Sequence, residues 1–245
     1  NRYSANSTTL MRRTLIAIAL RFWSGGNSSQ DKVFTWHKET DVNYFYQLKI
    51  TLKHVEPAVW RRFVVPANLT LDRLHDVVQI VMGWDDSHLH NFKFKKQIYT
   101  EFPEAVNETD EAEIRLNELL KSKRNKLTYT YDFGDCWEHE IVLEDKSHFG
   151  DEMQTPFECV EGSMMCPPED SGGPESYMHF LKVIFDPQNN EEEYEAYLEI
   201  LGLEEKSESD IKEFIFSYDR DVVNAALQLY ARWSRERTLA FNDDY

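Results

Sequence analysis

The stretch Lys126–Glu144, KLTYTYDFGDCWEHEIVLE, holds two rows of alternating apolar residues, one on each side of a glycine. Alternate residues of a strand share one face, so this pattern predicts an antiparallel β-hairpin. A three-residue loop at 134–136 puts both rows on the same face, whereas a two-residue turn would put them on opposite faces. The pairs predicted across the hairpin are Phe133–Trp137, Tyr131–His139, Tyr129–Ile141 and Leu127–Leu143.

The rest of the chain changes from strand patterns to helix patterns. Alternation predicts strands at 46–54, 59–65 and 88–99, and apolar spacing of three and four predicts a helix from Thr70 to Gly83. A short helix is expected within 114–122, and helices at 174–185, 189–202 and 219–237, while 101–113 is expected to be a loop and 145–173 mostly irregular. Strands first and helices later predict an α+β fold with a mainly antiparallel sheet.

The domain organisation follows from the same change of pattern. Residues 1–43 are expected to be a poorly structured tail or linker, and 44–245 a single α+β domain with a helical extension from about residue 203. The apolar run at 15–20 is six residues long, short of the ~7–15 of a secretory signal and of the ~20 of a membrane span. A cleaved signal at 11–23 remains the alternative reading of this tail.

Charge and cysteine content limit the partners. The formal net charge is −17; the first 45 residues hold six basic and three acidic side chains, so the other 200 carry −20. A body this acidic repels phosphate backbones, which makes non-specific nucleic-acid binding unlikely. Three cysteines do not suggest a disulfide framework. We therefore expect a cytoplasmic protein, not bound to a membrane, whose partner is an unknown small ligand or another protein.

Two short motifs resemble catalytic signatures without the residues that such signatures need. The letters DFG at 132–134 lack the catalytic loop, the glycine-rich loop and the lysine strand of a kinase. The letters EDSGGP at 169–174 resemble the nucleophile motif of serine proteases, but no matching histidine segment precedes them. We interpret the first motif as a strand end and turn, and neither as an active site.

The remaining candidates for a functional site are a group of histidines, cysteines and carboxylates. His139 lies on the apolar strand face, and His88 and His90 share a face with Phe92, so three histidines are expected to point inward. Asp132 is expected to oppose Glu138, which implies a nearby cation such as Arg61 or Arg62. The predicted ligand-binding residues are Trp84, Asp86, His88, His90, Tyr131, Asp135, Trp137, His139, Glu169 and Asp170.

Part of this group has the chemistry of a metal site. Cysteine, histidine and carboxylate suit a divalent ion such as zinc, and the predicted ligands are His88, His139, Cys159 and Cys166. Six residues separate the two cysteines, whereas about two to four separate the paired cysteines of a zinc knuckle. The alternative is that the histidines form hydrogen bonds in the core and tie the 157–173 loop to the sheet.

Four segments in order resemble one known family. They are PAVWRRFVVP (57–66), TLDRLHDVVQIVMGWDDSHLHNF (70–92), YTYDFGDCWEHEIVLE (129–144) and CVEGSMMCPPEDSGGPESY (159–177). This order and spacing is similar to that of the Ri-plasmid open-reading-frame-three-like family, whose members are also labelled passenger proteins of transposable elements. The resemblance covers about residues 44–202, with an extension to Asn224 left open, and implies an α+β fold and a link to plasmids and mobile elements. It implies no particular activity.

These observations favour a non-catalytic binding module whose pocket is formed by segments 85–90, 131–139 and 159–173. The alternative is a metal-dependent hydrolase or nuclease in which Asp135 or Glu169 serves as the base, so the enzyme question stays open. Sequence-specific DNA binding is suggested by the mobile-element link alone, and the acidic body argues against it.

Overall fold

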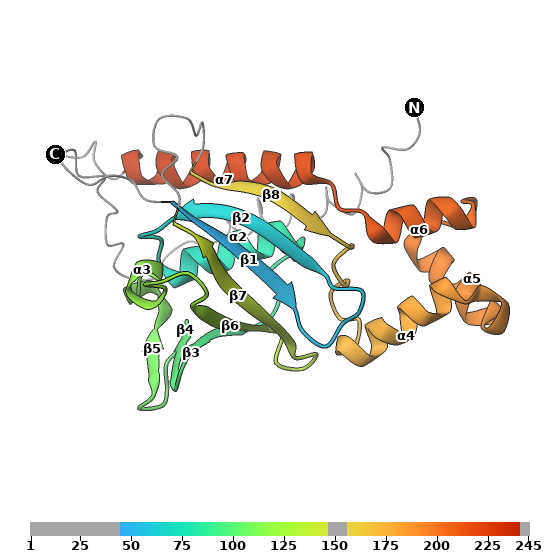
Figure 1. Ribbon diagram of the computed structural model, residues 1–245, viewed down its shortest axis with the longest axis horizontal. Coiled ribbons are helices and arrows are strands. Elements are labelled where there is room, and N and C mark those ends of the chain that lie inside the picture. Colours follow the sequence, from blue (N-terminus) through green and yellow to red (C-terminus); the bar gives the residue numbers. More distant parts are fainter. Residues whose placement is uncertain (1–44, 147–155, 241–245) are drawn as a thin grey trace.

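The computed structural model describes residues 45–146 and 156–240, so the predicted tail at 1–43 lies outside the described residues (Figure 1). One sheet has the strand order β5-β4-β3-β6-β7-β1-β2-β8. Its strand pairs are antiparallel except β4 with β5. The strands are β1 (Phe45–Leu52), β2 (Trp60–Pro66), β3 (His90–Phe94), β4 (Gln97–Thr100), β5 (Glu108–Asp110), β6 (Lys126–Tyr131), β7 (Trp137–Asp145) and β8 (Glu158–Ser163).

The helices fall mainly in the second half of the chain, which confirms the predicted α+β class. α7 runs beside β8, and α4, α5 and α6 extend from one side of the sheet (Figure 1). The helices are α2 (Leu71–Met82), α3 (Leu116–Leu119), α4 (Gly173–Phe185), α5 (Glu191–Leu201), α6 (Glu208–Phe216) and α7 (Arg220–Ala240), with short 3-10 turns η1 (Glu111–Glu113) and η2 (Pro187–Asn189).

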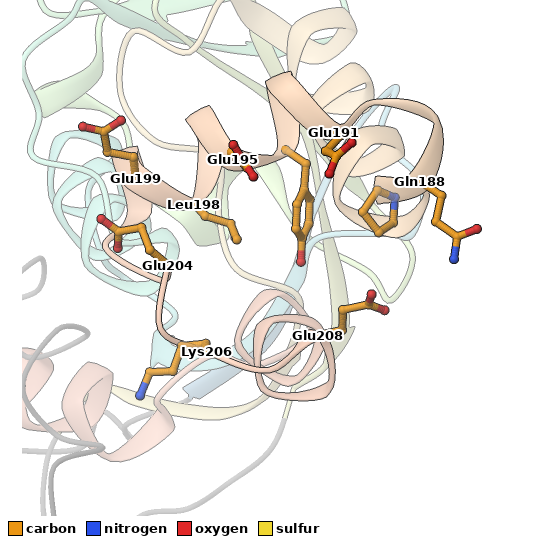
Figure 2. Close-up of a pocket in the computed structure, with 10 residues that line it drawn as sticks. Gln188, Glu191, Glu195, Leu198, Glu199, Glu204, Lys206 and Glu208 are labelled. Carbon is orange, nitrogen blue, oxygen red and sulfur yellow. The ribbon is translucent and has the colours of Figure 1, made fainter.

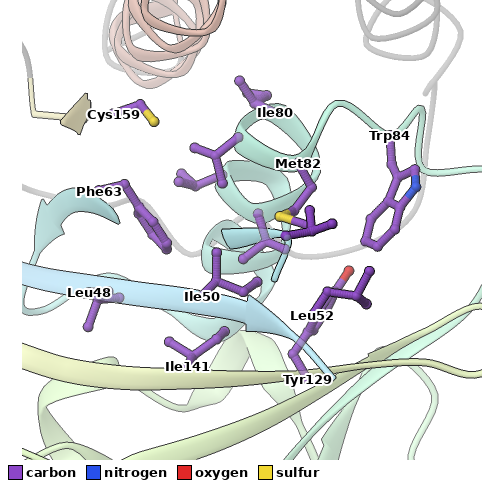
Figure 3. Close-up of a cluster of buried hydrophobic side chains, with 14 of the residues drawn as sticks. Leu48, Ile50, Leu52, Phe63, Ile80, Met82, Trp84, Tyr129, Ile141 and Cys159 are labelled. Carbon is purple, nitrogen blue, oxygen red and sulfur yellow. The ribbon is translucent and has the colours of Figure 1, made fainter. Parts of the chain in front are cut away.

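The core lies between α2 and the sheet (Figure 3). The predicted inward row of β1 is buried in full: Tyr46, Leu48, Ile50 and Leu52. α2 begins after Thr70 and ends at Gly83, whose φ of 95° is the left-handed conformation that glycine adopts without strain. Burying each large apolar side chain contributes about 1.5–3 kcal/mol, so this alternation is a main source of stability.

The C-terminal helices share that core. Ile211 and Ile215 of α6 and Leu227 of α7 are buried in the same apolar cluster as the β1 row. This packing supports the prediction that the chain from residue 44 onward folds as one domain, and that boundary stays a prediction. Among the described residues, no helix combines the length and the apolar character needed to cross a bilayer.

The predicted hairpin register is wrong by two residues. β6 and β7 pair Tyr131 with Trp137, Tyr129 with His139 and Leu127 with Ile141, around a five-residue loop at 132–136. Because the shift is even, both apolar rows still face the core. Phe133, predicted to continue its row, lies in the loop and is 51% exposed.

Asp132 is the physical reason for the longer loop. It has a positive φ of 54°, and its Oδ1 accepts hydrogen bonds from the backbone N–H groups of Gly134 (2.8 Å) and Asp135 (3.3 Å). Its carbonyl also accepts the N–H of Cys136. An aspartate that bonds to the backbone two residues ahead starts a turn, so β6 ends at Tyr131.

The expected charge opposition across this hairpin is also wrong. Glu138 is paired with Thr130 rather than with Asp132, and its cation is Lys53. Arg62 pairs instead with Glu144 and Glu161. The two-residue shift of register accounts for the changed partners.

Three elements were not predicted. β5 lies in the expected loop 101–113 and β8 in the region expected to be irregular, while α6 lies in the predicted helical extension from about residue 203 but its own bounds were not predicted. The predicted strand at 88–99 is two strands, β3 and β4, that turn at Lys95, which has a φ of 59°. β5 is three residues long, and its pattern is too short to separate from a loop.

Candidate functional site

The segments predicted to form a pocket meet where β6 ends and where β3 and β7 begin. We call residues 167–173 the arm. Trp84 Nε1 donates to the carbonyl of Pro167 at 3.0 Å. At the other end of the arm, the backbone N–H of Gly172 donates to Asp135 Oδ2 at 2.8 Å. The arm therefore bridges the segment after α2 and the hairpin loop, whereas residues 158–163 belong to β8, an edge strand separated from β7 by β1 and β2.

A histidine surrounded by three carboxylates lies under the arm. His88 Nε2 is 3.2 Å from Asp170 Oδ1, 3.7 Å from Asp132 Oδ2 and 3.8 Å from Glu169 Oε2. We call these four residues the His88 cluster. His88 Nε2 and Glu169 Oε2 are both buried and have no hydrogen-bond partner among the residues that the structure describes. Buried polar atoms of this kind normally have a partner, so the cluster has unused capacity to bind a ligand.

One carboxylate oxygen of Glu169 is hydrogen-bonded, and the other lies next to His88. Its Oε1 accepts hydrogen bonds from the Tyr131 hydroxyl (2.9 Å) and from the Asp85 N–H (3.0 Å). Burial raises the pKa of Glu169 to about 7, because desolvation disfavours the charged form. A cation beside Oε2 would favour the carboxylate form, so the arrangement is suited to positive charge.

Aromatic side chains form the buried wall behind this cluster. Trp84 stacks on Tyr131 with ring centroids 4.8 Å apart, and the His88 ring meets Tyr131 edge-on at 5.8 Å. Trp84, Tyr131 and Trp137 are at most 1% exposed. These three predicted ligand-binding residues therefore support the site from within and do not present a surface to a ligand.

Two further predicted residues, Asp86 and His90, belong to a second polar cluster with His75. The rings of His75 and His90 stack with centroids 3.4 Å apart and planes 4° from parallel. His75 Nε2 is 2.8 Å from Asp86 Oδ1, and its Nδ1 is 2.8 Å from the Tyr129 hydroxyl. An imidazole binds a metal in its own plane, so two parallel stacked rings cannot both direct a lone pair at one ion. We interpret this cluster as a hydrogen-bonded part of the core.

The sequence analysis did not name three residues of these two clusters: Asp132 beside His88, and His75 and Glu111 beside His90. His90 Nε2 lies 2.9 Å from Glu111 Oε1, and Glu111 is 3% exposed although it falls in the expected loop. A signal existed for His75, because it and Gln79 occupy the apolar face of the predicted helix four residues apart. Asp132 was predicted to end a strand and to oppose Glu138, but it was not named as a ligand-binding residue.

The family model described as "Plasmid pRiA4b ORF-3-like protein" matches residues 44–226, which include every residue of both clusters. The chain belongs to this family. The match extends past residue 202 to residue 226, close to the extension to Asn224 that the sequence left open, and takes in α6 and the first part of α7.

Two relatives agree with this assignment. The chain is 35% identical over 202 residues to "Uncharacterized protein y4hQ" of Sinorhizobium fredii, covering 78% of this chain and 97% of that protein. A crystal structure titled "Protein of Unknown Function MM3350 from Methanosarcina mazei Go1" matches with a TM-score of 0.61 at 31% identity. That match covers 74% of this chain and 98% of the other.

The predicted metal ligands do not come together in this family member. Among the described residues, the groups of three or more potential ligands within 4.8 Å are His75, Asp86, His90 and His88, Asp132, Asp170. Cys159 lies in β8, where its backbone is hydrogen-bonded to the Asn224 side chain. Cys166 precedes the arm, and burial raises its thiol pKa. Of the predicted four, only His88 is in a candidate group.

His139 points into the core, as predicted, and is fully buried. Its ring packs against Trp84 edge-on at 5.1 Å and against Tyr129 at 5.6 Å. Neither ring nitrogen has a hydrogen-bond partner among the described residues. Burial lowers the pKa of His139 to about 3, so the side chain stays neutral at ordinary pH and is a structural residue.

We expect His139 to make the fold sensitive to acid. Between pH 6.5 and about 3 the unfolded chain binds a proton that the folded protein does not, so stability falls as pH falls. From pH 7 to pH 5 the loss is about 2 kcal/mol. Urea unfolding of the wild type and of His139→Phe at both values measures it, and the substitution should remove this loss. If the stabilities of the two proteins change with pH in parallel, the prediction is wrong. Burial also raises the pKa of Asp76 to about 7, but Asp76 is present in both proteins, so its contribution cancels in the comparison.

A separate groove lies among the C-terminal helices (Figure 2). It has a volume of about 870 Å³ and is formed by one face of α5, the turn after it and the start of α6. Tyr194 and Leu198 provide apolar surface, and Glu195 and Glu199 lie on the same helix (Figure 2). No prediction from the sequence placed a pocket here, and none of the predicted site residues lines it.

Proposed function

We propose that this protein is a binding module whose site is the His88 cluster, at the junction of residues 85–90, the 131–137 hairpin and the arm. The observation that carries the proposal is the buried Nε2 of His88, which faces three carboxylates and has no hydrogen-bond partner within 45–146 and 156–240. Convergent polar groups against an apolar wall are the usual mark of a binding site. Such a site is rich in negative charge and favours a positively charged ligand.

Other properties of the chain support a cationic ligand. Three carboxylates share one imidazole, which neutralises at most one of them. The net charge of −17 adds to the attraction for cations and opposes the approach of nucleic acid.

The three cysteines are all unpaired, which supports the expectation of a reducing, cytoplasmic setting.

The test is a panel of small cations against neutral molecules of the same size. Amide spectra of the ¹⁵N-labelled chain should shift at 85–90, 131–137 and 167–173 on adding the diamagnetic ion Zn²⁺, butylammonium or agmatine, and should not shift with butanol. At least one cation must bind there, and Asp170→Asn must weaken it while Glu175→Gln, an exposed change on α4, does not. If no cation shifts these residues, the proposal fails.

A metal-dependent hydrolase is the second candidate, and one observation favours it. Asp170 is 79% exposed at its side chain, so the cluster is open to solvent on that side, and Glu169 beside it is placed to accept a proton. Asp135, the other predicted base, accepts the Gly172 N–H and holds the arm. Hydrolysis of a nitrophenyl phosphodiester with Mn²⁺, abolished by Glu169→Gln, would favour the enzyme over the binding module.

A further inference from the structure

We propose that the His88 cluster binds one divalent first-row transition-metal ion, with His88 Nε2, Asp132 Oδ2 and Asp170 Oδ1 as its ligands. This inference rests on the proposed function, since it names the cation that the same site takes. It replaces the cysteine-containing ligand set expected from the sequence with one imidazole and two carboxylates. The three ligand atoms lie within 4.8 Å of one another.

The separations between these atoms fit a shared ion. Ligand atoms each about 2.1 Å from a tetrahedral ion lie about 3.4 Å apart. The distances from His88 Nε2 to Asp170 Oδ1 and Asp132 Oδ2 are 3.2 and 3.7 Å. Both distances are within 0.3 Å of that value, and the two aspartate oxygens lie within 4.8 Å of each other, so they must close in around an ion by at most about 1.4 Å. Glu169 Oε2, 3.8 Å from the same nitrogen, is at a similar separation and can be a fourth ligand.

The same separations disfavour an organic ammonium group. An ammonium nitrogen lies about 2.8 Å from each oxygen that it contacts, so two acceptors around it are about 4.6 Å apart. The distances from His88 Nε2 to the nearest oxygens of the three carboxylates are all 3.8 Å or less. To admit an ammonium group, the carboxylates would have to move outward, and Asp132 and Glu169 are both held at their other oxygen.

Those second oxygens orient the ligands in advance. Asp132 Oδ1 accepts two backbone N–H groups of the hairpin loop, which turns Oδ2 toward His88. Glu169 Oε1 is fixed by Tyr131 and by the Asp85 N–H. Hydrogen bonds of this type to metal-binding carboxylates are a regular feature of protein metal sites and raise their affinity. The Asp132 side chain is 9% exposed, so it is largely removed from solvent.

The ligand atoms decide the class of ion. One imidazole nitrogen with two or three carboxylate oxygens suits Zn²⁺, Mn²⁺ or Fe²⁺, whereas Mg²⁺ and Ca²⁺ prefer oxygen alone. The sulfur atoms of Cys159 and Cys166 are in neither candidate group among the described residues. We therefore expect Mn²⁺ and Zn²⁺ to bind, and Mg²⁺ to bind at least tenfold more weakly than either.

Calorimetric titration of the chelator-treated full chain with MnCl₂ and ZnCl₂ tests the assignment. We use a Cys136→Ser background, because Cys136 is an exposed thiol that could bind zinc by itself. One ion per chain should bind, and His88→Ala should weaken binding at least about 100-fold. Asp170→Asn, at an exposed position, should weaken it at least about tenfold, and Glu175→Gln should leave it within twofold.

The outcomes separate this inference from the proposed function. Unchanged affinity in both His88→Ala and Asp170→Asn places the ion elsewhere and overturns the assignment. If neither ion binds below millimolar concentration but butylammonium or agmatine shifts the amides of the site, the metal assignment is wrong and the cation-binding function stands. If no cation of any kind binds, both are wrong. Circular dichroism of each variant verifies that it is folded.

Discussion

Replacing Arg61 with methionine is expected to lower the free energy of unfolding by about 3–5 kcal/mol. Arg61 is 2% exposed, and its guanidinium donates to the carbonyls of Val81, Trp60, Ser163 and Met164 at 2.8–3.0 Å. Methionine fills a similar volume but supplies no donor. Only the bonds to Val81 and Met164 are fully buried, and each buried carbonyl that loses its partner costs about 1–3 kcal/mol. Urea denaturation measures the total.

Arg62→Met is the matched control for this prediction. Arg62 is the next residue in β2, but its side chain is 25% exposed and pairs with Glu144 and Glu161 at the surface. Ion pairs of this kind contribute about 0–1 kcal/mol, so the same substitution one position later should have a small effect. Equal losses in the two variants would show that the interior carbonyl bonds of Arg61 contribute little.

Gly173→Ala is expected to displace the arm and weaken Mn²⁺ binding at the His88 cluster at least about tenfold. Gly173 has a φ of 80°, and a Cβ atom added there would lie 2.6 Å from the carbonyl oxygen of Asp135. That oxygen belongs to the backbone of the hairpin loop and cannot turn aside. The arm must therefore lift away from the loop and carry Asp170 with it, at a cost in stability of about 2–3 kcal/mol.

Gly83→Ala separates the clash from backbone strain. Gly83 has a similar φ of 95°, yet an added Cβ would meet no heavy atom within 4 Å. It should show only the strain of a left-handed alanine, about 1–2 kcal/mol, and should keep its Mn²⁺ affinity. Titration calorimetry on both variants measures the difference. If Gly83→Ala loses as much affinity as Gly173→Ala, the docking of the arm is not what forms the site.

The sequence predicts the faces of the elements better than it predicts their ends. Alternation in β1 and the helical spacing from Leu71 to Met82 depend only on which side chains are apolar, and both predictions are confirmed. The hairpin register was decided at Asp132, where one carboxylate bonds to two backbone N–H groups and lengthens the loop. Loop lengths of three and five place the same residues on the same faces, so the apolar pattern could not distinguish them.

The candidate site was predicted in its segments and in three of its four members, but not in how its residues group. His88, Glu169 and Asp170 were named in advance, and the structure brings them together. The prediction grouped them with His90 and Asp86, which turn into the neighbouring cluster because Asp86 has a φ of 60° and its N–H is bonded to Gln79. The path of an irregular segment such as 84–89 depends on bonds like these, which have no periodic signal in the sequence.

The His88 cluster is drawn from points far apart in the chain: Asp132 follows His88 by 44 positions and Asp170 follows Asp132 by 38. Joining them requires closure of long loops, which is slow and late in folding. An unfolded chain then has no such arrangement with which to hold an ion, so the ion stabilises only the folded form. At a free concentration 100 times its dissociation constant, it would add about 2.7 kcal/mol to stability through mass action. The melting temperature of this protein should therefore rise as the free concentration of the metal ion rises.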